Sequence, residues 1–223
     1  MNKRFLTIIA ALSLTSPVLA NQPKVEWYAP EATGCMVLRE CTEDVQQVYS
    51  LLDVSTNYSN PGRFTAIAGE FNTMLSYLNQ IGIDVFLADE KYFGVGQRGL
   101  YHTKYNKFFL NKTYMHRPGT LMSVMRHEAW HVAQDCMAGT IDNSLIGIIK
   151  PEDEVPMLYQ NMVERTYPKS VWPWEKEASW AGRTEGMTLD ALQACASDIP
   201  MWEIYEPTPL TRKYLVDYGF IQN

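Results

Sequence analysis

Apolar and polar residues alternate at different spacings along the chain, and these spacings predict the order of its elements. From Thr42 to Leu52, and again from Arg63 to Gly82, apolar residues recur every three or four positions, as on one face of a helix. The stretches "IDVFLAD" and "GLYHTKYNKFFLN" predict strands, with "TKYNK" as a hairpin turn. Helical spacing returns at Thr120, which is placed to cap that helix, and again after Pro173. This order predicts an α+β fold with a small antiparallel sheet.

The chain of 223 residues is long enough for one well-filled core and shows no internal repeat or dividing linker. Its first 20 residues combine Lys3 and Arg4 with an apolar run and a small residue at Ala20, which is typical of a secretory signal peptide. The apolar run is shorter than the ~20 residues that a membrane span needs. We therefore expect a signal peptide at 1–20 and a single domain at 21–223. The mature protein is expected to be secreted or periplasmic, with no membrane span.

The balance of charge excludes one class of partner. The 19 basic and 25 acidic residues give a formal net charge of −6, and removal of Lys3 and Arg4 makes the chain more acidic still. No basic run alternates with aromatic residues, and an acidic surface repels phosphate groups. We expect no nucleic-acid partner.

Four cysteines follow the signal segment: Cys35, Cys41, Cys136 and Cys195. An even number of cysteines in an exported chain is typical of disulfides, and three pairings are possible. We favour a short local bond between Cys35 and Cys41, which leaves Cys136 to pair with Cys195. No CxxC pair occurs, so a cysteine-bound zinc ion is not indicated.

The stretch "SVMRHEAWHVAQDCMAG" carries the main candidate chemistry. His127 and His131 are four residues apart, so on a helix both imidazoles project from one face and can reach one metal ion. Glu128 lies beside the pair, where a carboxylate can act as a general base without binding the metal. A catalytic zinc site normally has three protein ligands, so a third ligand must come from elsewhere in the chain.

The sequence "HEAWH" followed by "PWEKEASWAGR" resembles the gluzincin group of zinc metallopeptidases. Their third ligand is a glutamate on a later helix, often followed by alanine, and Glu177 with Ala178 fits that pattern. The resemblance implies a zincin-like fold in which His127, His131 and Glu177 bind Zn²⁺.

Two other carboxylates stay open as the third ligand, and one related group is excluded. The stretch "GTID" resembles part of the aspzincin motif and keeps Asp142 as a candidate, and Glu175 is a further alternative. The third histidine of the metzincin motif would fall at Met137, which excludes that group.

These residues together indicate an exported zinc metallopeptidase that hydrolyses peptide or protein substrates, with Glu128 as general base. An edge strand within "GLYHTKYNKFFLN" could pair with an extended substrate. The alternative is a non-catalytic exported zinc-containing module that binds peptides, although a purely structural zinc site has no use for Glu128. The candidates for stabilising the oxyanion are Tyr159, Tyr167, His102 and His116.

Overall fold

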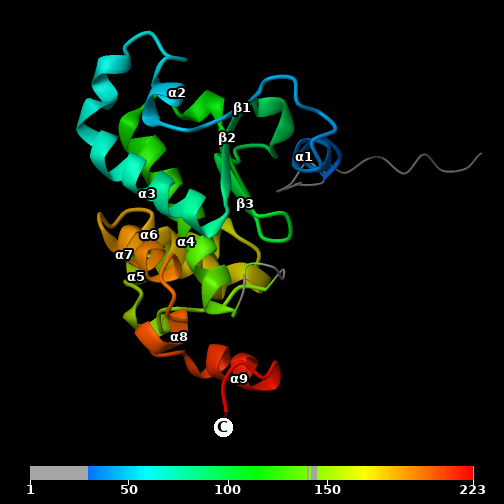
Figure 1. The fold of residues 1–223 in the computed structure, drawn as a ribbon, viewed down its shortest axis with the longest axis vertical. Coiled ribbons are helices and arrows are strands. Elements are labelled where there is room, and N and C mark those ends of the chain that lie inside the picture. The colour runs from blue at the N-terminus through cyan, green and yellow to red at the C-terminus, as the bar shows by residue number, and fades with distance from the viewer. Residues whose placement is uncertain (1–29, 140, 142–144, 223) are drawn as a thin grey trace, which may run out of the picture.

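A computed structural model describes residues 30–139, 141 and 145–222 (Figure 1). The signal segment expected at 1–20 and the candidate ligand Asp142 lie outside the described residues. The helices and strands are α1 (Pro30–Val37), β1 (Val45–Gln47), α2 (Leu51–Ser55), α3 (Ala68–Ile81), β2 (Asp84–Ala88), β3 (Gly99–His102), β4 (Lys107–Asn111), α4 (Pro118–Met137), α5 (Met157–Thr166), α6 (Trp172–Ala181), α7 (Met187–Cys195), α8 (Met201–Ile204) and α9 (Pro209–Asp217). This content confirms the α+β class.

The sheet is mixed, so the expectation of an antiparallel sheet was wrong at its centre. Its strand order is β1-β2-β4-β3: β1 and β2 are antiparallel, β2 and β4 are parallel, and β3 and β4 form the expected hairpin. After β2 the chain crosses to the opposite edge of the sheet, where β3 runs antiparallel to β2. The hairpin after β3 then places β4 between β2 and β3. Because β3 already reverses direction, β4 runs parallel to β2.

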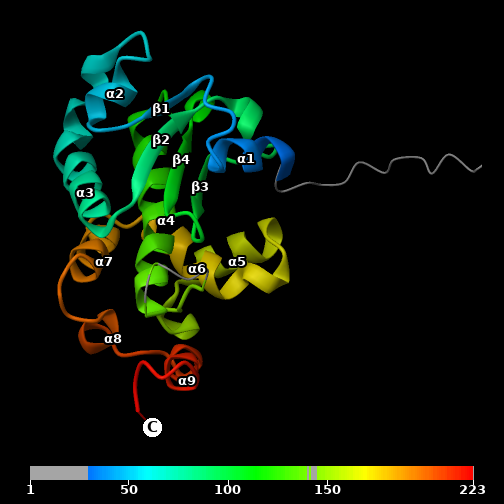
Figure 2. The same cartoon turned by 45° about the vertical axis from the view of Figure 1, so that its right-hand side comes forward.

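Two layers of helices cover this sheet, as Figures 1 and 2 show together. Val85 and Leu87 of β2 face a core built with α3 and α4, whereas Phe86 and Ala88 face a smaller cluster with α1. Successive side chains of a strand point to opposite faces, so a strand covered on both faces is apolar throughout. The continuous apolar runs of β2 and β4 are therefore those of central strands.

The helix expected from Thr42 to Leu52 is the second correction. Residues Val45–Gln47 instead form β1, which pairs with β2, and α2 begins only at Leu51. Asp53 fixes this start, because its Oδ2 accepts hydrogen bonds from the backbone N of Tyr49 at 2.9 Å and of Ser50 at 2.8 Å. Pairing with a neighbouring strand thus overrides the local helical spacing.

The later helices agree more closely with the sequence pattern. Helix α3 ends at Gly82, which adopts φ +98°, as expected. Helix α4 begins at Pro118, ahead of Thr120, because proline suits the first helical position. Among the described residues, none of the helices combines the length and apolar character that a membrane crossing requires.

Both expected disulfides are confirmed: Cys35 bonds to Cys41 and Cys136 to Cys195. Cys136 lies near the end of α4 and Cys195 at the end of α7. The two helices also share a buried cluster that includes Trp130, Ala133 and Ala191. This bond therefore reinforces packing at the lower end of the long central helix (Figure 2).

We predict that the double substitution Cys136→Ser/Cys195→Ser lowers the free energy of unfolding by on the order of 4 kcal/mol. The sequence separation across this bond is 59 residues, so its loss frees a long loop in the unfolded chain. The corresponding Cys35→Ser/Cys41→Ser variant, with a separation of 6 residues, should lose about 2 kcal/mol. Urea denaturation measures both values, and equal losses would contradict an origin in chain entropy.

Candidate metal centre

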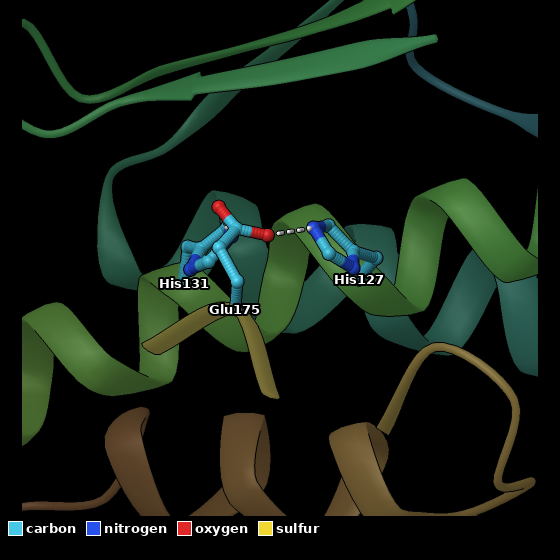
Figure 3. A group of neighbouring side chains, drawn as sticks. All are labelled: His127, His131 and Glu175. Atoms are coloured by element: carbon cyan, nitrogen blue, oxygen red, sulfur yellow. Dashed lines mark ion pairs between the residues drawn. The ribbon is translucent and has the colours of Figure 1, made fainter. Parts of the chain in front are cut away.

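Helix α4 presents His127 and His131 on one face, as their four-residue spacing requires. The two rings lie edge to face, with centroids 5.0 Å apart and an interplanar angle of 87°. Figure 3 shows both rings close to the carboxylate of Glu175, which α6 supplies. The helix thus brings two nitrogen ligands to one place, and a second helix adds a carboxylate.

Glu175 completes the group that the two histidines begin. Its Oε2 lies 3.2 Å from Nε2 of His127, and its Oε1 lies 3.6 Å from Nε2 of His131. The exposed fraction of the side chain is 17% for His127, 12% for His131 and 16% for Glu175. Among the described residues, this is the one group of three histidine, cysteine or acidic side chains whose ligand atoms all lie within 4.8 Å of one another.

The expected third ligand, Glu177, lies outside this group, and the alternative candidate, Glu175, lies at the histidine pair. Two residues along a helix correspond to a rotation of about 200°, so the side chains of Glu175 and Glu177 leave α6 in different directions. Glu177 is fully buried and accepts hydrogen bonds from the backbone N of Lys150 at 2.7 Å and of Ile149 at 3.2 Å. Its carboxylate is satisfied by these donors and does not reach the histidine pair.

The sequence does contain a signal that favours Glu175 over Glu177 at the histidine pair. Glu175, Ala178 and Gly182 follow one another at spacings of three and four, and so form one stripe on α6. At Gly182, an added Cβ would lie 2.9 Å from Ser123 O and 3.1 Å from His127 Cβ of α4. The small residues of the stripe thus mark the side that packs against α4, and Glu175 extends from that side.

The pKa values of His127 and Glu175 depend on each other. Burial works against protonation of His127, but the hydrogen bond and charge of Glu175, with the charge of Glu128, raise the pKa of His127 to about 9. Burial likewise opposes ionisation of Glu175, and its contacts with His127, His131 and Tyr167 outweigh this effect and lower its pKa. The carboxylate is therefore held ionised, in the form that binds cations.

The donor set fits a zinc ion. Two imidazole nitrogens and one carboxylate are the ligand types of catalytic zinc sites, which keep a fourth position open. Oε2 of Glu175 is buried and lies 3.2 Å from Nε2 of His127. A buried carboxylate oxygen that faces two imidazoles in this way is a suitable cation ligand.

Glu128 lies beside the group and is held by the edge of the sheet. Its Oε2 accepts a hydrogen bond of 3.0 Å from the backbone N of Tyr101 in β3. Burial raises the pKa of the Glu128 carboxyl, and the nearby histidines partly offset this effect. Glu128 is thus next to the candidate ligands without being one of them, as the sequence predicts for a general base.

Of the four side chains considered for the oxyanion, Tyr167 comes to the site, where it hydrogen-bonds with Glu175. His116 is exposed, with its Nδ1 3.0 Å from Thr113 O. His102 follows Leu100 by two residues in β3 and so shares its face, which packs towards α1. Tyr159 is half-buried in α5.

We predict that Gly99→Ala lowers the free energy of unfolding by about 1–3 kcal/mol through overpacking. An added Cβ would lie 2.6 Å from Val124 Cγ1, 2.7 Å from Glu128 Cγ and 2.9 Å from Glu128 Oε1. Gly119→Ala in α4 is the control, because a Cβ there meets nothing within 4 Å and alanine suits a helix, so this change should not lower stability. Chemical denaturation of both variants tests the contact, and equal stability would show that β3 does not press on Glu128.

Comparison with known proteins adds no further assignment. The candidate function of this protein therefore rests on the geometry of His127, His131, Glu175 and Glu128. No protein-family model, no curated protein and no solved structure matches this chain.

Proposed function

We propose that this protein is an exported zinc-dependent metallopeptidase of zincin-like architecture. One observation carries the proposal: His127, His131 and Glu175 converge from two helices, while the neighbouring Glu128 is held apart from them by β3. A structural zinc site uses four protein ligands and needs no additional carboxylate, whereas a hydrolytic site uses three ligands and a base. The arrangement supports the second description.

In this proposal, the imidazoles of His127 and His131 and the carboxylate of Glu175 would hold a zinc ion. When bound at such a site, zinc acts as a Lewis acid that lowers the pKa of water towards ~7 and polarises a carbonyl group. The protein's own contribution begins with holding these three side chains, most of whose surface is buried.

Glu128 moves the proton. Its carboxylate accepts a proton from the attacking water and transfers it to the departing amine nitrogen. The buried setting that raises the pKa of Glu128 makes it a better base than an exposed carboxylate. The hydrogen bond from Tyr101 N orients the carboxylate while leaving its second oxygen available.

The open edge of β3 is suited to an extended peptide. Asn111 N donates to Arg98 O at 2.9 Å, so Arg98 and Asn111 form a hydrogen-bonded pair of the antiparallel ladder. Hydrogen-bonded pairs alternate along such a ladder, so the backbone groups of Leu100 also bond to β4. The backbone N–H and C=O groups of Gly99 and Tyr101 therefore point away from β4, towards the outer edge of the sheet. Tyr101 N already points at Glu128. A peptide added to this edge would therefore run past the general base, and the proposed substrate class is peptide or protein.

Tyr167 is the side chain best suited to stabilise the developing negative charge. Burial raises the pKa of its phenol, with the charges of Glu175 and Glu128 acting in the same direction, so it stays a protonated donor. Its hydroxyl hydrogen-bonds with Glu175 and therefore lies at the candidate ligand group, where a phenol donor would stabilise negative charge on a carbonyl oxygen.

The proposed location is secreted or periplasmic. Both disulfides are present, and disulfides persist in oxidising compartments. The apolar segment with Lys3 and Arg4 at the start of the sequence supports export through a signal peptide.

We predict that the purified protein carries about one zinc per chain and that Glu175→Ala loses most of it, because two imidazoles bind zinc incompletely. Elemental analysis after dialysis measures both. Glu185→Ala, which removes an exposed carboxylate beyond α6, should retain the metal. Retention in Glu175→Ala together with loss in Asp142→Ala would instead assign the third ligand to Asp142.

We further predict that Glu128→Gln retains zinc while peptide turnover falls by about 10²–10⁴-fold, because glutamine keeps the shape but cannot accept the proton. Hydrolysis of a mixed peptide library measures turnover, with Glu185→Gln as a matched control that should keep full activity. Full activity in Glu128→Gln would remove Glu128 from the mechanism. A wild-type protein that binds zinc but cleaves no peptide would favour the non-catalytic peptide-binding module.

A further inference from the structure

Glu177 belongs to a buried hydrogen-bond chain that leads to His131. Oε1 of Glu177 accepts from Nε2 of Gln134, and Oε1 of Gln134 lies 2.6 Å from Nδ1 of His131. Gln134 and Glu177 are both completely buried. Buried polar groups need partners, so the orientation of each group in this chain constrains the next.

The amide orientation of Gln134 is set by its surroundings. Its Nε2 lies 3.1 Å from Trp174 O, a backbone carbonyl that can only accept, and the same nitrogen donates to Oε1 of Glu177. The nitrogen of the amide must therefore point to this side and the oxygen to the other. Since the amide oxygen can only accept, Nδ1 of His131 must carry the proton of the bond between them.

Glu177 is itself anchored by the backbone. The backbone N–H groups of Ile149 and Lys150 donate to its carboxylate at 3.2 and 2.7 Å. The backbone N–H of Gly147 donates to the backbone carbonyl oxygen of Gln134 at 2.7 Å. The segment around Ile149 thus fixes both members of the chain. This hydrogen-bond chain does not include His127, because the His127 ring hydrogen-bonds to the backbone of Ala178 instead.

We propose that Glu177 and Gln134 are positioning residues that hold His131 as its Nδ1–H tautomer, with the lone pair of Nε2 directed at Glu175. Only this tautomer leaves Nε2 available as a ligand. Partners of this kind that orient a ligating histidine typically change metal affinity by about 10–100-fold when they are removed. The inference rests on the proposed zinc site, but the tautomer itself is a property of the protein without metal.

The tautomer can be measured without metal or activity. In ¹⁵N-labelled metal-free protein, two-bond ¹⁵N–¹H spectra distinguish the Nδ1–H and Nε2–H forms of His131 at a pH where the ring is neutral. We expect the Nδ1–H form alone in the wild type. Gln134→Met, which keeps the length of the side chain and removes its polar atoms, should admit the Nε2–H form and weaken zinc binding by about 10–100-fold.

A second variant tests Glu177 without changing its shape. Glu177→Gln places an amide NH₂ where it must face either the NH₂ of Gln134 or the N–H groups of Ile149 and Lys150. One of these bonds must break, so both tautomers of His131 should appear and zinc affinity should fall, by less than in Gln134→Met.

Thr211→Val is the matched control for a merely structural role. Thr211 Oγ1 accepts from Ile148 N at 2.9 Å and donates to Ile148 O at 2.8 Å, so the variant loosens the same segment without touching the hydrogen-bond chain. It should keep the wild-type tautomer and zinc affinity. A change equal to that of Gln134→Met would overturn the proposal.

The outcomes separate this inference from the proposed function. An Nε2–H form in the metal-free wild type, or Nδ1–H alone in Gln134→Met, overturns the positioning role whatever the zinc content. The expected tautomers in a protein that binds no zinc would support the hydrogen-bond chain and refute the proposed function.

Discussion

Helices α4 and α6 cross so closely beside His127 that a single added methyl group at Gly182 would meet the backbone of Ser123 and the Cβ of His127. The candidate centre depends on this crossing, because its two nitrogen ligands come from α4 and its carboxylate from α6. Ala178 is fully buried in the same interface. Small side chains let the two backbones approach, and the approach brings the carboxylate of Glu175 within reach of both imidazoles.

The same crossing creates buried polar groups that must be satisfied. Glu177 lies inside it with no exposed surface, and burial raises the pKa of this carboxyl to about 7 against the opposing effect of Gln134 and two backbone N–H groups. Lys176, which is 3% exposed, donates to Glu152 and Glu164 from the other side of α6. A helix with three consecutive charged residues can be buried here because each residue finds its own partners.

The edge strand β3 relates the sheet to the candidate centre. Tyr101 contacts α4 twice: its backbone N donates to Glu128 at 3.0 Å and its hydroxyl donates to Asp135 at 2.7 Å. Gly99 provides the space that the Glu128 side chain occupies. Strand and helix are therefore fixed against each other on both sides of His131, which places the outer edge of the sheet beside Glu128.

The features that depend on local spacing could be predicted from the sequence. The four-residue interval placed His127 and His131 on one face, Gly82 ended α3, and the turn in "TKYNK" formed the hairpin. The disulfide pairing also followed from the sequence, since a bond between Cys35 and Cys41 leaves one partner for Cys136. The helix face, the helix end, the turn and the short disulfide need only the geometry of a few neighbouring residues, whereas the pairing of Cys136 with Cys195, 59 residues apart, followed by elimination.

The tertiary structure decided the rest. It placed Glu175 at the histidines and Glu177 in the interior, made β2 and β4 parallel, and drew Val45–Gln47 into the sheet. The rotation of α6 about its axis is set by which small residues pack against α4, and strand neighbours are set by where a connection crosses the sheet. These are contacts between segments far apart in the chain, so the local pattern of either segment does not determine them.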